Sequence, residues 1–231
     1  MGFPSIDHAL GFASSRAGIG KTALVVELAA WFAARGHSVA LLDADLGAPD
    51  ALGRLGAQAR AGERGGTQQP LELHGLACFS LGRWLEHNGL VGVPGELLEQ
   101  RLAPLLDDGI DFGRRELLLV DLAPGAEQNE SWLEALGLEA LVRVALGTDE
   151  SAPDCPLPVL GRIETLASAS QGARGPRGAT LLGRIPFDPA LRALSTSGRP
   201  LVLEDARSPA AQAIAQAGAQ LWKRVRNRLQ G

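Results

Sequence analysis

The segment at residues 14–22, with the sequence SSRAGIGKT, constrains the fold of this chain more than any other stretch. It follows an apolar run at residues 8–13, which predicts a short strand, and it leads into a helix predicted over residues 21–35. Small residues at such a turn let successive backbone N–H groups point at phosphate oxygens, and the helix adds its positive end. Lys21 would neutralise phosphate charge and the Thr22 hydroxyl would bind Mg²⁺. A glycine-containing turn with a chance lysine is the alternative, but the spacing favours a phosphate-binding loop.

The rest of the chain alternates short apolar runs with amphipathic stretches. Strands are predicted at residues 8–13, 38–42, 76–81, 116–120, 141–146, 159–163 and 180–185, and helices at residues 21–35, 95–106 and 209–229. This alternation predicts an α/β fold with a mostly parallel sheet flanked by helices on both faces. Two loops rich in Gly, Gln and Arg, at residues 57–70 and 168–178, are interpreted as exposed connections. We therefore expect residues 1–231 to form a single domain.

Three aspartates stand at the ends of predicted strands. Asp43 and Asp45 end the strand that follows the first helix, and Asp121 ends the most apolar strand of the chain. An aspartate at the position of Asp121 holds the water shell of Mg²⁺ in nucleotide-binding proteins, and an aspartate pair beside the metal can orient an attacking water. Turn capping is the alternative role for such residues. Two acidic strand ends beside a phosphate loop favour the metal and water site.

Composition places the chain among ordinary globular proteins. Its 231 residues are 45% hydrophobic and carry a net charge of −4, so we expect no sequence-specific binding of nucleic acid. No apolar run approaches the ~20 residues that cross a bilayer, and the N-terminus does not read as a signal peptide. A cytoplasmic protein is therefore predicted. The two cysteines, Cys78 and Cys155, form no CxxC motif, and Lys21 and Lys223 are the only lysines.

The chain resembles the MinD/ParA/Mrp group of dimeric P-loop ATPases, beginning with the stretch GFASSRAGIGKTALVVELAAWFAARGHSVALLDADLGAPD. The group has a KGGxGK[ST] loop, and its next strand ends in DxD. Within this group the chain is more similar to the Mrp-type (ApbC-type) iron–sulfur carrier ATPases. Its LLDADLGAPDALGRLG is similar to their LLDADIYGPSIPxMLG, its ELLLVDLAPG to their DYLVVDLPPG, and its LLGRIPFDPALR to their LLGEIPLDPAIR. The likeness covers nearly the whole chain and implies a three-layer P-loop NTPase fold.

The resemblance also implies ATP and Mg²⁺ as cofactors and a role for individual residues. The loop residues that would bind ATP are Ala17, Gly18, Ile19, Gly20, Lys21 and Thr22. Thr22 and Asp121 would hold Mg²⁺, and Asp45 would position the attacking water. The family works as a homodimer that sandwiches the nucleotide, and the first lysine of KGGxGK reaches the partner's phosphates. Arg16 stands at that position, so the implied catalytic residues are Lys21, Asp45 and Arg16.

Several positions depart from the family's pattern. Ser15 and Ala17 replace loop glycines, and Arg16 keeps the charge of the usual lysine but not its compact ammonium. Thr165 stands where the family usually has an asparagine that reads adenine, which leaves base selectivity open, whereas Pro186 would still flank the base. Nucleotide binding is expected to survive these changes, while hydrolysis is left open.

The expected cargo site of the Mrp-type carriers is missing from this sequence. Those carriers have a C-x-x-C motif just after the strand that corresponds to residues 159–163, so that two subunits supply four thiolates to one cluster. Residues 167–179 contain no cysteine, and Cys155 lies before that strand. We therefore do not expect an iron–sulfur cluster.

Residues 221–229 form a basic amphipathic end, with Leu221, Trp222, Val225 and Leu229 on one face. MinD-like proteins use such an end to bind anionic membrane. The likeness to the Mrp C-terminus favours a helix packed on the sheet, with its cations complementing the helix dipole.

Three functions stay open at this point. The main hypothesis is a dimeric ATPase that hydrolyses Mg·ATP slowly and acts as a nucleotide-dependent switch or carrier for an unidentified protein partner or cargo. The second is a degenerate, non-hydrolysing adaptor or scaffold, and the third is a positioning ATPase of the MinD/ParA type.

Overall fold

The computed structural model describes residues 3, 5–57, 69–92, 102–146, 154–167 and 179–228, apart from the side chains of residues 107, 108 and 194–196. Its strands are β1 (Ile6–Ala13), β2 (Val39–Ala44), β3 (Leu71–Leu73), β4 (Leu76–Ser80), β5 (Arg115–Leu122), β6 (Ala140–Leu146), β7 (Val159–Ala167) and β8 (Leu181–Pro186). Its helices are α1 (Lys21–Ala33), α2 (Ala51–Arg54), α3 (Leu81–His87), α5 (Glu130–Ala135), α6 (Pro189–Ser197), α7 (Leu201–Glu204) and α8 (Pro209–Arg228), with a π-helical turn η1 (Leu105–Gly109) and a 3₁₀ turn η2 (Ala126–Gln128).

Within these residues the strands form one sheet in the order β3-β4-β2-β5-β1-β6-β7-β8. All neighbouring strands are parallel except β3, which runs antiparallel to β4. The predicted α/β class with a mostly parallel sheet is confirmed. Because β5 lies between β2 and β1, the carboxyl ends of these three strands meet at one edge of the sheet. The register pairs Asp121 with both Asp43 and Phe12.

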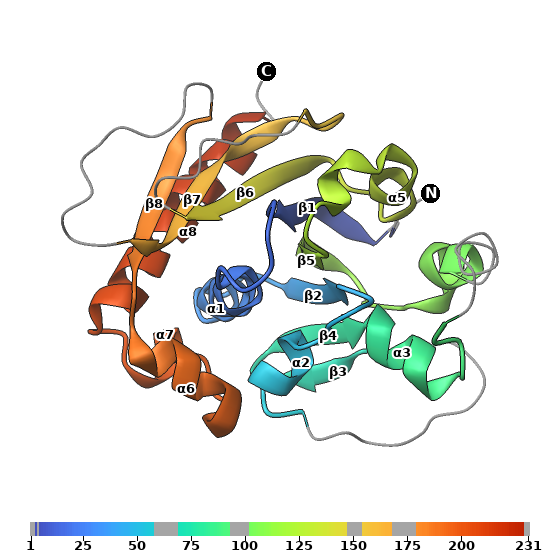
Figure 1. Cartoon of the computed structure of the whole chain (residues 1–231), viewed down its shortest axis with the longest axis horizontal. Helices are drawn as coiled ribbons and strands as arrows, with labels where there is room; N and C mark the ends of the chain where they lie inside the picture. The colour runs from blue at the N-terminus through green and yellow to red at the C-terminus, as the bar shows by residue number, and fades with distance from the viewer. Residues whose placement is uncertain are drawn as a thin grey trace.

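Helices cover both faces of the sheet and give the fold three layers (Figure 1). One hydrophobic core lies between the sheet and the helices α1, α2, α7 and α8, where Leu28, Phe32 and Ile214 are fully buried. The second core lies on the opposite face beneath α3, η1 and α5. Since β2, β5 and β1 are covered on both faces, their sequences are almost continuously apolar. This explains why they were recognisable from the sequence.

The predicted elements differ from the observed ones mainly at their ends. The strand predicted at residues 38–42 extends to Ala44, and the strand predicted at residues 159–163 extends to Ala167. Residues 95–101 of the helix predicted at 95–106 lie outside the described residues, as do most of the two predicted loops. The short elements β3, α2, α3, α5, α6 and α7 were not predicted, because they have too few residues to show a periodic pattern.

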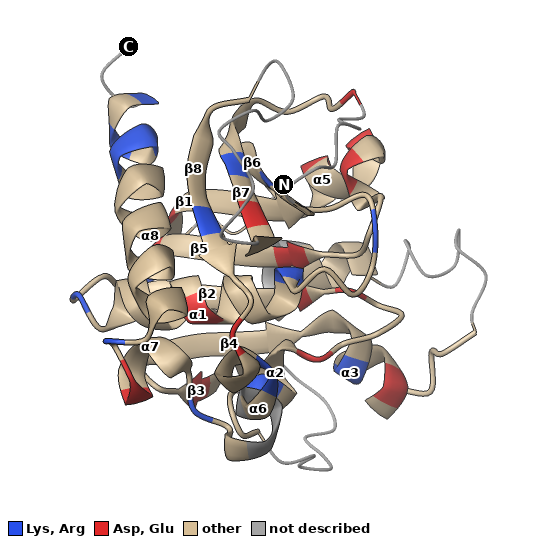
Figure 2. Cartoon of the chain, turned by 60° about the vertical axis from the view of Figure 1, so that its left-hand side comes forward, with Lys and Arg blue, Asp and Glu red and all other residues tan. Residues whose placement is uncertain are grey.

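Buried ion pairs join the outer strands β7 and β8. Glu164 has no solvent exposure, and its two carboxylate oxygens accept hydrogen bonds from Arg162 Nη2 and Arg184 Nε, each at 2.6 Å. Figure 2 shows basic and acidic residues side by side on these strands. Because Arg184 and Glu164 lie on neighbouring strands, this network pairs the edge strand β8 with the sheet by charge as well as by backbone hydrogen bonds.

Helix α8 packs its apolar side against α1 and β8. Leu221 and Val225 are buried, and the Trp222 ring lies 4.6 Å from that of His37. The packing predicted for this end of the chain is therefore present. Among the described residues, no helix has the length and apolarity to pass through a bilayer.

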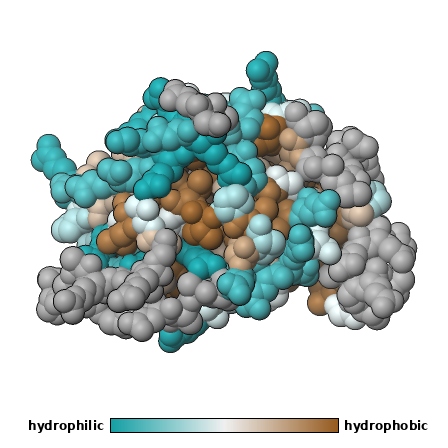
Figure 3. Space-filling model, turned by 90° about the horizontal axis from the view of Figure 1, so that it is seen from above, coloured by the Kyte–Doolittle hydropathy of each residue, from teal (hydrophilic) through white to brown (hydrophobic). Residues whose placement is uncertain are grey.

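The face seen from above has hydrophobic residues at its centre and hydrophilic residues around them (Figure 3).

Candidate nucleotide-binding site

The loop between β1 and α1 has the backbone that an anion-binding turn requires. Gly18 and Gly20 have φ angles of +75° and +86°, in the left-handed region that strains other residues. Gly20 is also the N-cap of α1, and no side chain caps this helix. The first N–H groups of the 13-residue helix therefore face the cavity side without a side-chain acceptor, and the helix dipole adds positive charge there. This local geometry supports the predicted phosphate loop.

Lys21 and Asp121 form a buried ion pair at the start of α1. Lys21 is 6% exposed and Asp121 is fully buried, and Lys21 Nζ donates to Asp121 Oδ1. Burial raises the pKa of Asp121, while Lys21 and a hydrogen bond from Thr22 lower it. The second oxygen, Asp121 Oδ2, is buried and has no hydrogen-bond partner among the described residues. The Asp121 carboxylate, with one oxygen unpartnered, and the Thr22 hydroxyl that bonds to this carboxylate are oxygen ligands of the kind that Mg²⁺ prefers.

Asp43 and Asp45, which the sequence analysis treated as a pair, have different surroundings. Asp43 is buried and accepts backbone N–H groups of Asp45 at 3.2 Å and of Ala51 at 3.0 Å. Burial, with Asp121 nearby, raises the pKa of Asp43 to about 7. Asp45 Oδ1 accepts N–H groups of Gly47 and Ala48 at 3.2 and 3.1 Å. Asp43 thus holds the loop that follows β2 and the start of α2, and Asp45 is the one that reaches the cavity.

A cavity of about 770 Å³ opens beside the loop, within the usual range of about 300–1,000 Å³ for ligand pockets. Of the site residues predicted from the sequence, those that line this cavity are Arg16, Ala17, Gly18, Gly20, Lys21, Thr22, Asp45, Thr165 and Pro186. Ile19 and Asp121 do not line it, because the Ile19 side chain is buried in the core and Asp121 lies behind Lys21. The fold therefore gathers almost all of the predicted residues around one cavity.

The predicted base end of the cavity has one feature that the sequence did not reveal. Thr165 is 4% exposed, and its hydroxyl donates to the Ile19 carbonyl at 2.6 Å. Leu166, the next residue, has a φ of +53°, and its side chain is 45% exposed at the cavity, as is Phe187 at 61%. Thr165 thus connects β7 to the phosphate loop, and the large apolar surface at this end comes from its neighbours. Its contact with a base stays a prediction.

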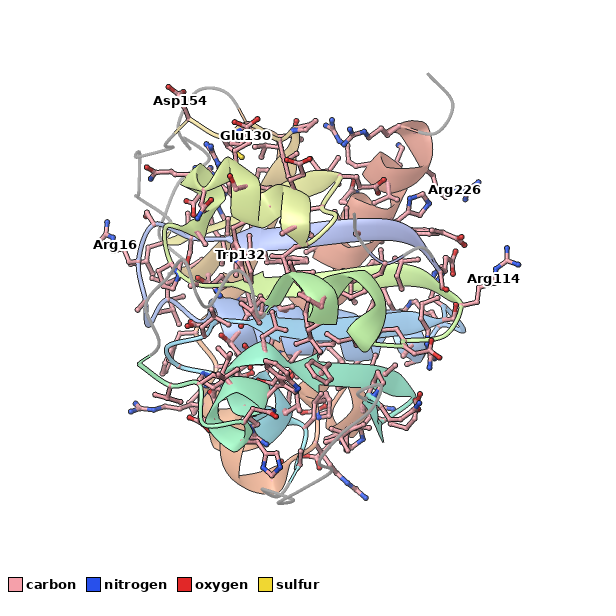
Figure 4. All side chains as sticks on the ribbon, turned by 90° about the vertical axis from the view of Figure 1, so that its right-hand side faces the viewer. Arg16, Arg114, Glu130, Trp132, Asp154 and Arg226 are labelled. Atoms are coloured by element: carbon pink, nitrogen blue, oxygen red, sulfur yellow. The ribbon has the colours of Figure 1, made fainter. Side chains whose placement is uncertain are left out.

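Two further segments border the phosphate end. The Gly125 N–H donates to the Ser14 carbonyl at 2.9 Å, which ties the loop after β5 to the start of the phosphate loop, and Pro124 lines the cavity. Arg16 is exposed and points away from the body of the molecule at this end of the sheet, opposite the end where Arg114 lies (Figure 4).

Sequence reasoning missed the walls that α2 and α6 contribute. Asp50, the N-cap of α2, and Arg54 within it line the same cavity, as do Leu191 and Arg192 from α6. Arg54 Nε lies 2.7 Å from Asp50 Oδ2. A signal for the first pair was present, since Asp50 and Arg54 stand where the similar stretch LLDADIYGPSIPxMLG has Ser and Met.

The chain belongs to the ParA family, because the family's sequence model, described as NUBPL iron-transfer P-loop NTPase, matches residues 5–149, more than half of the chain. An iron-sulfur cluster carrier protein of Deinococcus radiodurans is 29% identical over 91% of this chain and 68% of its own length. An iron-sulfur protein required for NADH dehydrogenase, mitochondrial, from Arabidopsis thaliana is 26% identical over 84% of this chain and 71% of its own length. The chain spans 66% of the length of an iron-sulfur cluster carrier protein of Mycobacterium leprae.

Solved structures support the fold. The cell division ATPase MinD of Pyrococcus furiosus superposes with a TM-score of 0.68 at 19% identity, over 94% of this chain and 99% of that one. A nucleotide-binding protein of Archaeoglobus fulgidus, solved in complex with ADP, has a TM-score of 0.64 at 19% identity, over 89% of this chain and 90% of that one. The predicted resemblance to the MinD/ParA/Mrp group is confirmed, and the chain is a P-loop NTPase by family and by fold.

Proposed function

We propose that this chain is a cytoplasmic ATPase that binds Mg·ATP, dimerises with it, hydrolyses it slowly and acts as a nucleotide-dependent switch or carrier. The observation that carries the proposal is the convergence of Lys21, Thr22 and Asp121 at the uncapped start of α1, beside a cavity of about 770 Å³. Membership of the ParA family and the ADP complex of the Archaeoglobus fulgidus protein support nucleotide as the ligand.

The chain's own residues suit the binding and orientation of a triphosphate. Backbone N–H groups of residues 17–22 surround the phosphates, and Lys21 supplies a fixed positive charge from a buried position. Thr22 and Asp121 would hold Mg²⁺, which would supply further neutralisation of phosphate charge. Asp45 orients the water that attacks the γ-phosphate, and Pro186 borders the base. In the proposed dimer, exposed Arg16 would reach the phosphates bound by the partner subunit.

The hydrogen bonds of Asp45 favour the non-hydrolysing adaptor as a second candidate. Both bonds from Gly47 and Ala48 fall on the same Oδ1 atom, and they fix the carboxylate to its own loop. If these contacts persist with bound nucleotide and turn the carboxylate away from the γ-phosphate, Asp45 does not place a water. Binding without turnover is then the expected behaviour.

The cargo is a separate part of the proposal. The curated relatives are named iron-sulfur cluster carriers, and this chain has no CxxC motif. Cys78 is buried in β4, and Cys155 stands alone in the segment before β7. We keep the prediction that the chain carries no iron–sulfur cluster on paired cysteines. Anaerobic reconstitution followed by iron and sulfide analysis of the protein tests it.

Calorimetric titration of the protein with ATP and ADP, with and without Mg²⁺, tests the core of the proposal. Light scattering after size exclusion reports the mass in each state. We expect Mg-dependent binding in the micromolar range and a doubled mass with ATP. Lys21→Ala should remove binding, whereas Lys223→Ala, at the only other lysine, should leave it unchanged. Retained ATP binding by folded Lys21→Ala protein contradicts the assignment of the loop.

A further inference from the structure

The turn between β3 and β4 contains a backbone outlier that the nucleotide site does not use. His74 and Gly75 form the two-residue connection, with φ angles of +51° and +79°. Both angles are positive, as in the tight hairpin turns that favour Asn-Gly. A positive φ is uncommon for residues other than glycine, although histidine adopts it more often than most, and such conformations persist where the surroundings support them. The contacts of the His74 imidazole provide that support.

The His74 ring joins two segments that are far apart in the sequence. Its Nε2 lies 2.9 Å from the Gly198 carbonyl and 3.3 Å from the Leu55 carbonyl. Both partners are acceptors, so Nε2 carries the proton and shares it between them. Leu55 is the C-cap of α2, where helix carbonyls lack intrahelical partners, and Gly198 follows α6 directly. One side chain from the sheet edge thus holds the ends of two helices.

The backbones of these two segments touch at the same place. Gly56 and Gly198 have φ angles of +77° and +68°. A Cβ atom on Gly198 would lie 2.5 Å from Gly56 Cα and 2.9 Å from Gly56 N, closer than real Cβ atoms approach. The contact requires glycine at position 198, and a Cβ atom on Gly56 would also be tight, at 3.2 Å from the Gly198 carbonyl oxygen. Together with the His74 hydrogen bonds it forms what we call the latch, made of His74, Leu55, Gly56 and Gly198.

The latch connects the two walls of the nucleotide cavity. Helix α2 follows the Asp45 loop and contributes Asp50 and Arg54 to the lining, while α6 follows the base-side Pro186 and contributes Leu191 and Arg192. The two helices also pack against each other. Since the walls meet at the latch, a displacement of one wall moves the other unless the latch opens.

We propose that the latch makes α2 and α6 move as one body, so that His74 is a positioning residue for nucleotide binding. This rests on the proposed function, because it assumes that the cavity takes a nucleotide. Opening the latch lets the phosphate-side and base-side walls move independently, and the bound nucleotide must then order both of them. The affinity for nucleotide falls by that ordering cost.

Two variants open the latch in different ways. His74→Asn keeps a residue that tolerates the left-handed turn but is too short to bridge both carbonyls. Gly198→Ala forces the two backbones apart. Matched controls are His37→Asn, which removes a histidine contact to Glu116 elsewhere, and Gly113→Ala, at a φ of +65° with open space around it. The controls separate loss of the latch from general loss of stability.

The measurements are ADP affinity by calorimetry and hydrogen exchange of the α2 and α6 segments. We expect His74→Asn to weaken ADP binding about three- to tenfold and Gly198→Ala at least as much, with exchange rising in both segments together. The double variant should bind ADP no more weakly than the single variant with the lower affinity, since both substitutions act on one contact. The controls should bind ADP as the wild type does.

Affinities within twofold of the wild type for both latch variants overturn the proposal, as does faster exchange in one segment without the other. If the wild-type protein binds no ADP, the proposed function fails, and exchange in the nucleotide-free variants decides the latch by itself.

Discussion

Glu27 offers the sharpest test of how buried charge shapes the stability of this fold. It lies in the middle of α1 with no solvent exposure. Its two carboxylate oxygens accept the backbone N–H groups of Leu201 at 2.8 Å and Val202 at 2.9 Å, at the start of α7. Burial raises the pKa of Glu27 from 4.5 to about 7, although these two hydrogen bonds and Arg54 lower it. The side chain therefore joins the P-loop helix to α7 at an electrostatic cost.

The sign and size of that cost follow from the pKa. The folded protein holds the Glu27 proton more tightly than the unfolded chain does. The contribution of protonated Glu27 to the free energy of unfolding is therefore complete below pH 4.5 and is lost as the pH rises through about 7. A rise in the pKa of this carboxyl from 4.5 to about 7 lowers the free energy of unfolding by about 3 kcal/mol between the two ends of this range. Glu27→Gln cannot ionise. We therefore expect its stability relative to the wild type to improve by about 3 kcal/mol from pH 4.5 to pH 8.

Urea unfolding of both proteins across this pH range measures the difference directly. Other buried carboxyls, such as Asp43, titrate in both proteins and cancel. Glu72→Gln is the control for the loss of an exposed carboxylate, because the Glu72 side chain is 61% exposed in its pair with Arg115. A constant difference between Glu27→Gln and the wild type from pH 4.5 to 8, or one that changes in the opposite direction, would refute the reasoning.

Three further predictions concern the phosphate loop. Gly20→Ala, at a φ of +86°, should cost about 1–2 kcal/mol of stability by urea unfolding and weaken ADP binding in calorimetry; unchanged values for both contradict the left-handed loop. Thr165→Val should lower the free energy of unfolding by about 1 kcal/mol and weaken ADP binding, because the buried Ile19 carbonyl loses its hydrogen-bond donor. Thr165→Ser keeps the hydroxyl and should behave as the wild type does. An equal loss of stability in both variants argues against the hydrogen bond. Lys21→Met should destabilise the folded protein by about 3 kcal/mol, because it leaves the buried Asp121 carboxylate without its partner. Adding Asp121→Leu should recover most of this stability. A double variant less stable than Lys21→Met contradicts the ion pair.

The phosphate loop shows how far local sequence reasoning extends. Residues 14–22 are contiguous, so their chemistry can be recognised without knowing any long-range contact. Asp45 and Asp121 were recognisable in the same way, because each follows an apolar run that predicts a strand. The meeting of Asp121 with Lys21 depends on the strand order β2-β5-β1. The sequence analysis did not predict that order, and the structure shows it.

Other contacts of the site were not predicted. The departures at Asp50 and Arg54 were visible in the sequence, but their ion pair was not, and neither was the hydrogen bond from Thr165 to Ile19. The same is true of the Glu164 network on β7 and β8. Each joins side chains whose types are ordinary on a surface, and burial or a partner distant in the sequence gives them their role. A periodic pattern reports which face of an element is apolar, but it does not report which polar residues end up in contact.

By itself the sequence determined the fold class, the phosphate loop and the acidic strand ends, because each of these rests on short runs whose periodicity and spacing are visible in one dimension. Only the tertiary structure decided which residues share the cavity. It separated Asp43, which holds its loop, from Asp45, which reaches the cavity. It also brought His74 to Gly198, 124 residues away in the chain. The physical reason is that such contacts depend on how the sheet orders its strands and how α2 and α6 pack, and no local stretch of sequence encodes either.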